Sequence, residues 1–442
     1  MPTPPPSDDS IDTLVASRLP GWLTQAPAPR LLELHVCLRE QQAVQQRLEA
    51  LFGSLTPLDE FAAPLLEKML FEQLACSVDV RKAELQMPLP EHYPAARPEA
   101  PGGVRKRTLQ HSLLVCALQN FSDGEAKSSG LMDSSKLLDA MGEPLPMAAR
   151  AFAGQCRRLD LGGQYQAHLR QQLLAPGVAT LLEQGQRHVL EVALRLAALR
   201  GDIDETALIQ CLAAIAATPG VVTRMRPAAL GVLGIQVRGA VAFELHRQGQ
   251  GEGQLQGVLC WLPDDPHGAI SWHASWDVLF QALGVRFRLP GYPEYFQRFV
   301  SERDRERYTL ALAHAMAQGS GHAAVVLDGR HEVIHEPLFQ HMRQTLLDTL
   351  FDDAKVLAVP TAEQDSGERD RCLQFYASLG LDLLGLASFY VPGLGLPLLA
   401  IGALQVVGDV YEGYVDWQLA ERQGALEHAF SVAVNVALTR QA

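Results

Sequence analysis

The stretch LLELHVCLREQQAVQQRLEALF, residues 31–52, places leucine and valine mostly at spacings of three and four residues. The apolar positions are Leu31, Leu34, Leu38, Val44, Leu48 and Leu51, with Arg, Glu and Gln between them. This spacing is that of one face of an α-helix. It indicates a helix with one buried side, and we predict a mainly α protein with a multi-helix body.

The helical pattern extends outward from this stretch over residues 11–227. Residues 1–10 are rich in Pro, Ser and Asp and are predicted to be disordered. Five prolines at 87–103 predict a loop inside the helical region.

Two short motifs in this region predict helix ends. Gly201 is expected to end one helix, and Asp202 or Asp204 to cap the next. In RRLDLGGQY, residues 157–165, Asp160 is expected to pair with a neighbouring arginine, Arg157 or Arg158, while the two glycines let the backbone turn.

The pattern changes at residue 228. LGVLGIQVRGAVAFEL (230–245) and GQLQGVLCWLP (253–263) are β-branched runs punctuated by glycine, which predict a hairpin. Helical patterns follow them, so residues 228–330 are predicted to form a small α+β insert. Residues 331–442 are predicted to return to helices and to end in a hydrophobic helical hairpin at 379–417.

Composition excludes some classes of protein. Hydrophobic residues make up 48% of the 442 positions, which is enough to bury a core. The net charge of −13 disfavours a nucleic acid partner, whose phosphates would be repelled. Seven scattered cysteines without a CxxC pair predict no disulfide framework. Because the first residues lack a basic and an apolar region, we expect no classical signal peptide.

The hairpin at 379–417 contains the most unusual segment. Residues 383–408 carry no charged side chain over 26 positions, and Pro392, Gly393, Leu394 and Gly395 form a turn between two apolar halves. Such halves can pair their backbone groups internally in lipid. The flanking acids are Asp382, Asp409, Glu412 and Asp416. Because an ionised carboxylate costs about 2.5–3.5 kcal/mol at the bilayer centre, protonation of these acids would favour insertion. The alternative is a hairpin buried inside a helical bundle.

An enzymatic alternative rests on His331-Glu332-Val333-Ile334-His335, which fits the zinc motif HExxH, with His341 as a third ligand. On a helix the first two imidazoles would share a face. Pro337 disfavours a helix at this point, however. We therefore predict surface histidines at a helix start, no metal and no cofactor, and keep a zinc-dependent hydrolase as the alternative.

Several fragments resemble one known family. They are RLPGWL (18–23), LLVCALQNF (113–121), CRRLDLGGQYQAHL (156–169), RGDID (200–204), VLCWLPDDP (258–266), YPEYFQRFVSERDRERY (292–308), DDAKVLAVPTAEQD (352–365) and EGYVDWQLAERQGAL (412–426). Together they resemble the N-terminal domain of dermonecrotic and RTX-like toxins, including large toxins of pseudomonads and of the Pasteurella multocida type.

The resemblance implies a non-catalytic bacterial module for host-cell engagement, or for membrane insertion and translocation of a toxic payload. Its expected partners are a host membrane or receptor and a payload domain, fused or separate. We expect synthesis in the bacterial cytoplasm followed by secretion or delivery to host cells. Since the chain ends about where such modules end, we expect the payload to be absent, separate or removed. A purely structural scaffold is the remaining alternative.

Overall fold

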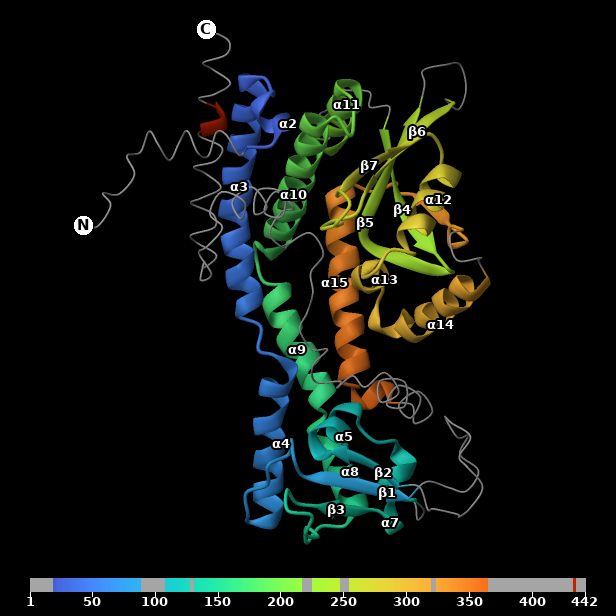
Figure 1. The fold of residues 1–442 in the computed structure, drawn as a ribbon. Coiled ribbons are helices and arrows are strands. Elements are labelled where there is room, and N and C mark those ends of the chain that lie inside the picture. The colour runs from blue at the N-terminus through green and yellow to red at the C-terminus, as the bar shows by residue number, and fades with distance from the viewer. Residues whose placement is uncertain are drawn as a thin grey trace, which may run out of the picture. The chain divides into compact units, whose positions relative to one another are not determined.

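The computed structural model of the protein describes residues 19–88, 108–127, 131–216, 225–246, 254–318, 323–364 and 432–434. It is mainly α with a small sheet region, as predicted (Figure 1). The chain divides into two compact units, and each unit is assembled from separate stretches of sequence. Residues 379–417, where the hairpin was expected, lie outside the described residues.

The first unit takes its described residues from 19–52, 176–347 and 432–434. Its elements are α2 (Gly21–Thr24), α3 (Ala28–Gly53, up to residue 52), α10 (Val178–Arg200), α11 (Glu205–Ala216), β4 (Met225–Val232), β5 (Ile235–His246), β6 (Leu255–Trp261), β7 (Ile270–His273), α12 (Trp276–Arg286), α13 (Tyr292–Phe296), η1 (Gln297–Phe299), α14 (Glu302–Gln318), β8 (Arg330–Val333) and the start of α15 (Leu338–Leu357).

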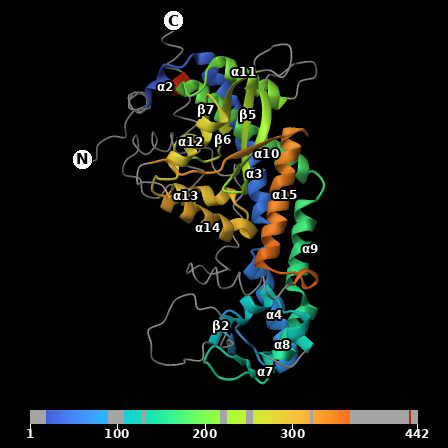
Figure 2. The same cartoon turned by 90° about the vertical axis from the view of Figure 1, so that its right-hand side faces the viewer.

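The five-stranded sheet of this unit has the order β7-β6-β5-β4-β8, and all neighbours are antiparallel. Alternate residues of β5 face opposite sides, since Ala242 joins the core beneath α12–α14 whereas Phe243 joins the core shared with α10, α11 and α15. Figures 1 and 2 show these helices on the two sides of the sheet. The sheet is therefore covered by helices on both faces.

Helix α3 has the predicted periodicity, with two buried glutamines, Gln41 and Gln45, in addition. Its buried side chains include Leu31, Leu34, Val44 and Leu48, and the stripe is completed by Gln41, which is only 3% exposed. Amide side chains thus occupy places in a stripe that is apolar elsewhere.

The junction between α10 and α11 also agrees with the sequence. Gly201 follows α10 with φ at 82°, a conformation that glycine adopts without strain. The Asp204 carboxylate accepts a hydrogen bond from the Ala207 N–H at 2.7 Å and so caps α11.

The second unit takes its described residues from 53–175 and 348–364. Its elements are α4 (Leu58–Leu74), β1 (Glu84–Pro88), β2 (Thr108–Ser112), α5 (Leu113–Gln119), α6 (Asp123–Lys127), α7 (Leu131–Ser134), β3 (Lys136–Leu138), α8 (Ala149–Leu159), α9 (Leu161–Leu173), the end of α15 and η2 (Thr361–Glu363). Strands β1–β3 form a three-stranded sheet of order β2-β1-β3, which the sequence pattern did not predict.

Residues 351–361 of this unit form a strap that is fastened by side chains from α5 and α9. Gln119 donates to the carbonyls of Val356 and Leu357, each at 3.0 Å. Gln166 donates to the carbonyl of Phe351 at 2.9 Å. Gln119 satisfies backbone acceptors in the last turn of α15, where a helix leaves carbonyls unpaired, and Gln166 adds a bond to a carbonyl further inside the helix.

Asp160 fixes the far end of the strap. It follows α8 and precedes α9 in a left-handed conformation, with φ at 46°. Its carboxylate accepts hydrogen bonds from the N–H groups of Gly163, at 3.2 Å, and Thr361, at 2.8 Å. The expected helix end at Asp160 is present. The carboxylate caps a helix and holds the strap, and the arginine pairing that the sequence suggested for it is not among its described contacts.

Gly162 allows the strap to lie directly against α9. A Cβ atom at this position would come within 2.5 Å of the Ala358 carbonyl oxygen. The contact is with backbone, which cannot rotate away.

We predict that Gly162→Ala destabilises the second unit by about 1–3 kcal/mol, because it overpacks this contact. Amide hydrogen exchange in α5 and α9 measures the loss. Gly154→Ala, in α8, is the matched control, since a Cβ there meets nothing within 4 Å. Equal protection in the two variants would contradict the strap contact.

Candidate functional site

A buried carboxylate, Asp265, fastens the loop between β6 and β7. Asp265 is 0% exposed. Its Oδ2 accepts hydrogen bonds from Arg286 Nη1, at 2.6 Å, and from the Tyr292 hydroxyl, at 2.9 Å. Its Oδ1 accepts one from the His267 N–H at 2.8 Å. A buried charge is tolerated when it is paired and hydrogen-bonded in this way.

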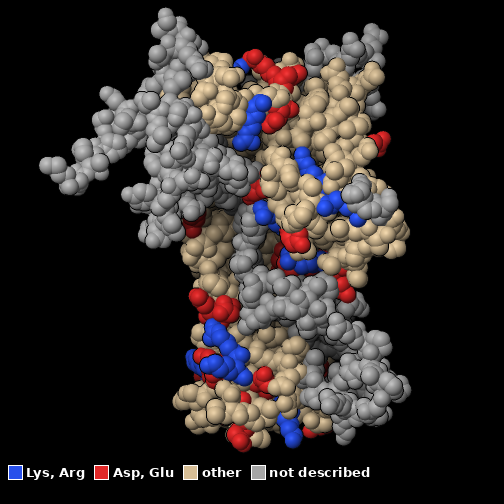
Figure 3. All heavy atoms as spheres, in the orientation of Figure 1, with Lys and Arg blue, Asp and Glu red and all other residues tan. Residues whose placement is uncertain are grey.

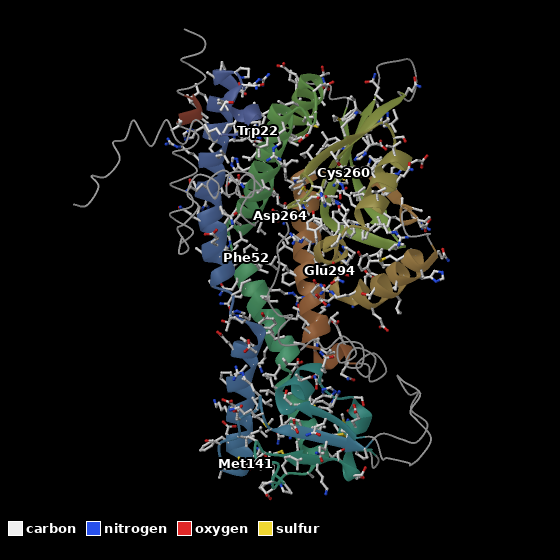
Figure 4. The ribbon with its side chains drawn as sticks, in the orientation of Figure 1. Trp22, Phe52, Met141, Cys260, Asp264 and Glu294 are labelled. Atoms are coloured by element: carbon white, nitrogen blue, oxygen red, sulfur yellow. The ribbon has the colours of Figure 1, made fainter. Side chains whose placement is uncertain are left out.

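The two residues before Asp265 in this loop contact α13 and η1. The Tyr295 hydroxyl donates to the Pro263 carbonyl at 2.8 Å. The Arg298 guanidinium carbon lies over the Tyr295 ring, 4.5 Å from the ring centroid. Arg298 Nη1 lies 3.7 Å from Asp264 Oδ2. Figure 4 labels Asp264 in this loop and Cys260 on the preceding strand. Two of the fragments that carry the family resemblance, 258–266 and 292–308, thus meet here.

Burial sets the protonation of this cluster. It raises the pKa of the Tyr292 and Tyr295 hydroxyls well above the usual range, so both act as donors. Burial opposes the charge of Arg286, but the Asp265 carboxylate and the smaller contributions of Tyr292 and Cys260 together outweigh burial and raise the pKa of Arg286. Burial also raises the pKa of the Cys260 thiol to about 12. Cys260 is therefore a protonated thiol and a poor nucleophile at neutral pH.

A second polar cluster surrounds Glu244 on the same face of the sheet. Glu244 Oε1 accepts from Trp276 Nε1 at 2.8 Å, and Oε2 lies 3.0 Å from His246 Nε2. His331 Nε2 lies 3.5 Å from Oε1, and its ring stacks on Trp276 with centroids 4.0 Å apart. Burial raises the pKa of Glu244, but hydrogen bonds from His246 and Trp276 outweigh it and lower that pKa overall.

His273 on β7 is neutral in this environment. Its Nε2 lies 2.9 Å from the Ser271 hydroxyl. Burial, together with the positive charge of Arg286, lowers the pKa of His273 to about 4.

The HExxH residues do not assemble as the zinc motif requires. Residues 331–333 lie in strand β8, and α15 begins only at Leu338. In an extended chain, residues four apart are separated by about 13 Å, which is too far for two ligands of one metal. His331 contacts Glu244, and His341 contacts Glu336. The predicted helix start at these histidines is wrong for His331, because pairing with β4 makes that segment a strand.

Within the described parts of the chain, no group of three or more His, Cys, Asp or Glu side chains is placed to hold a metal ion. No helix there is long and apolar enough to cross a membrane. The proposed insertion residues, Asp382, Pro392, Gly393, Leu394, Gly395, Asp409, Glu412 and Asp416, all lie outside the described residues.

Acidic and basic side chains of the coloured residues are intermixed on the face drawn in Figure 3, so this face has no surface charge of a single sign.

The sequence analysis did not predict the clusters around Asp265 and Glu244. Asp265 stands in the LPDDP segment, but nothing in the sequence shows that Arg286 and Tyr292 fold onto it.

Part of the chain matches a known protein family. Residues 52–303, more than half of the chain, match the family described as the dermonecrotic toxin N-terminal domain. The strap at 351–361 and the uncharged stretch at 383–408 lie beyond the matched residues. Comparison with curated proteins gave no match.

We predict that Asp265→Asn destabilises the first unit by about 3–5 kcal/mol, because the buried pair is broken and the partly buried charge of Arg286 is left unpaired. Urea unfolding followed by the fluorescence of the sheet tryptophans measures the loss. The control is Asp264→Asn, which removes a partly exposed ion pair and should cost at most about 1 kcal/mol. Similar midpoints for the two variants would refute the cluster's role.

We predict that His273 weakens the first unit in acid. Its folded pKa of about 4 lies below the unfolded value of about 6.5. The unfolded state therefore binds more protons in this window, so the stability present above pH 6.5 is lost as the pH falls towards 4. Unfolding curves at pH 7 and pH 5 should differ less for His273→Gln than for the wild type. An unchanged difference would rule out this titration.

Proposed function

The chain belongs to the dermonecrotic toxin N-terminal domain family, and from this premise we propose that it is the non-catalytic delivery module of a bacterial toxin. In this proposal the module engages a host cell and inserts the apolar segment at 379–417 into its membrane, which allows a toxic payload to be translocated. The payload is either fused to the module or separate. The protein is delivered to host cells from the bacterium that makes it.

The position of the uncharged stretch between two anchored segments carries the proposal. On one side, residues 351–361 are fastened to the second unit by Gln119, Gln166 and Asp160. On the other side, residues 432–434 are buried in an apolar cluster of the first unit with Leu31, Leu34 and Leu196. A segment that is held at both ends can enter a bilayer only as a loop that returns.

The sequence of the stretch fits a loop of this kind. Pro392 to Gly395 interrupts the apolar run near its middle, and the two halves can pair their backbone groups as helices. Asp382 and Asp409 flank the run and would resist entry while ionised. Protonation of these acids removes that resistance, and the low pKa of His273 adds an acid-weakened contact in the first unit.

The non-catalytic role is supported by the chemistry of the described polar clusters. The Asp265 carboxylate is 0% exposed and already accepts hydrogen bonds from Arg286 and Tyr292, so a substrate has no access to it. The buried thiols of Cys211 and Cys260 have their pKa raised to about 12, so neither is an activated nucleophile. These groups fasten loops and helices together.

We predict that the full chain releases dye from anionic lipid vesicles at pH 5 much faster than at pH 7.4. Leu394→Asp should reduce the acid-driven leakage at least about tenfold, because a carboxylate at the turn must enter the bilayer.

Leu310→Asp is the matched control. Leu310 is 63% exposed on α14, so the same change there should leave both folding and leakage intact. Equal leakage from Leu394→Asp and wild type would reject insertion at the turn. Absence of acid-driven leakage from the wild type would leave a scaffold that positions a payload without touching lipid.

A further inference from the structure

The contact between α3 and α10 differs from the other interior contacts of the first unit. The two helices lie side by side (Figure 1) and share an apolar cluster in which Leu31, Leu34 and Cys37 meet Val192 and Leu196. This apolar part covers only the first half of α3.

The next part of the contact is polar, and several of its buried polar atoms lack hydrogen-bond partners in the described residues. Gln41 is 3% exposed, and neither its Nε2 nor its Oε1 has a hydrogen-bond partner within the described chain. Gln186, 5% exposed on α10, has an unpartnered Oε1 by the same measure. A buried amide group without a partner costs about 1–3 kcal/mol relative to its hydrated form.

The two amides lie at about the same level of the helix pair. His188 Nδ1 on α10 lies 4.0 Å from Glu40 Oε2 on α3, and Glu40 is the residue before Gln41. That distance is beyond hydrogen-bond reach, so His188 Nδ1 is buried without a hydrogen-bond partner in the described residues. The Nε of Arg195, about two turns further along α10, also lacks a hydrogen-bond partner in the described residues. Unsatisfied polar atoms thus recur along this contact.

The sheet core of the same unit is satisfied differently. Asp265 has three hydrogen bonds, and Glu244 accepts from Trp276. Two single atoms in the sheet cores, Trp261 Nε1 and Tyr308 Oη, are also buried without a hydrogen-bond partner among the described residues. Water would satisfy one atom at each of these residues, whereas along α3 it would satisfy both amide atoms of Gln41 together with Gln186 Oε1. Opening therefore costs less along α3 than through the sheet.

We propose that the α3–α10 contact is a seam along which α3 separates from the first unit while the five-stranded sheet stays folded. Separation uncovers the apolar stripe of α3 and the facing residues of α10. It also removes the cluster that buries residues 432–434, and so releases one anchor of the uncharged stretch. The seam opens without lipid, and the inference therefore stands or falls apart from membrane insertion.

The protein carries its own reporters of this motion. Cys37 is 6% exposed and lies on the α10 side of α3, whereas Cys260 is 1% exposed in the sheet core. Both thiols react with a small reagent only when their surroundings open. Cys76 is exposed and reports the intrinsic rate.

The test is thiol labelling of the full chain at constant neutral pH without lipid, with each cysteine followed by peptide mass spectrometry. Rates are normalised to those of the same cysteine in urea. Cys37 should react at least about tenfold faster than Cys260 if opening at the seam is local. Equal protection of Cys37 and Cys260 would overturn the proposal.

Gln41→Leu sharpens the test, because it replaces the unpartnered amide by an apolar side chain of similar size. It should slow the labelling of Cys37 about tenfold and leave Cys260 unchanged. Gln46→Leu, on the exposed side of α3, is the matched control and should change neither rate. Gln186→Leu should act in the same direction as Gln41→Leu, which provides a second variant should the first fail to fold. Faster labelling of Cys37 in folded Gln41→Leu would show that the amide stabilises the contact, and unchanged labelling would show that it does not weaken it. Either result would overturn the seam.

Discussion

Hydrogen bonds from side chains to the backbone of residues 351–361 are the constraint on which the functional account depends. Gln119, Asn120 and Asp160 bind the carbonyl and N–H groups of this strap. Their partners are peptide groups, so substitutions of the strap's side chains leave most of the bonds in place. The strap therefore keeps a fixed place on the second unit, and the chain that leaves it towards residue 383 starts from a fixed point.

In the first unit, hydrogen bonds of buried carboxylates hold loops and helices against the sheet. Asp265 holds the β6–β7 loop against α12 and α13, and Glu244 ties β5 to α12. In both clusters burial of the carboxylate is compensated by several donors, which makes the sheet region costly to open. The contact between α3 and α10 lacks this compensation at Gln41. The unit thus combines a well-fastened sheet with a weaker helix contact, and that weaker contact includes the residues that anchor the other end of the uncharged stretch.

Local patterns predicted the local structure well. The apolar spacing of 31–52 predicted α3, and Gly201 with Asp204 predicted the break between α10 and α11, because both signals act within one or two turns of helix. Strands β1 and β2 were missed, since each has five residues and the proline-rich stretch between them dominates the pattern. His331 was expected at a helix start, but pairing of β8 with β4 decides its conformation, and that pairing joins residues about 100 positions apart.

The site residues show the same division. Asp160 was expected to act locally, and it does cap α9, but its bond to Thr361 spans 201 positions and has no sequence signal. Gln41 lies in the stripe that the spacing of the leucines predicts to be buried. Its burial could therefore be predicted from the sequence, but its lack of hydrogen-bond partners could not. Long-range polar contacts depend on the assembled fold.

The most direct test of the central claim places a nitroxide at position 394 through Leu394→Cys and measures its exposure to oxygen and to a water-soluble nickel complex by electron paramagnetic resonance. On acidified vesicles the account predicts high oxygen exposure and low nickel exposure, the signature of a label within lipid tails. A label that stays equally exposed to nickel at pH 5 and pH 7.4 in the presence of vesicles would contradict it.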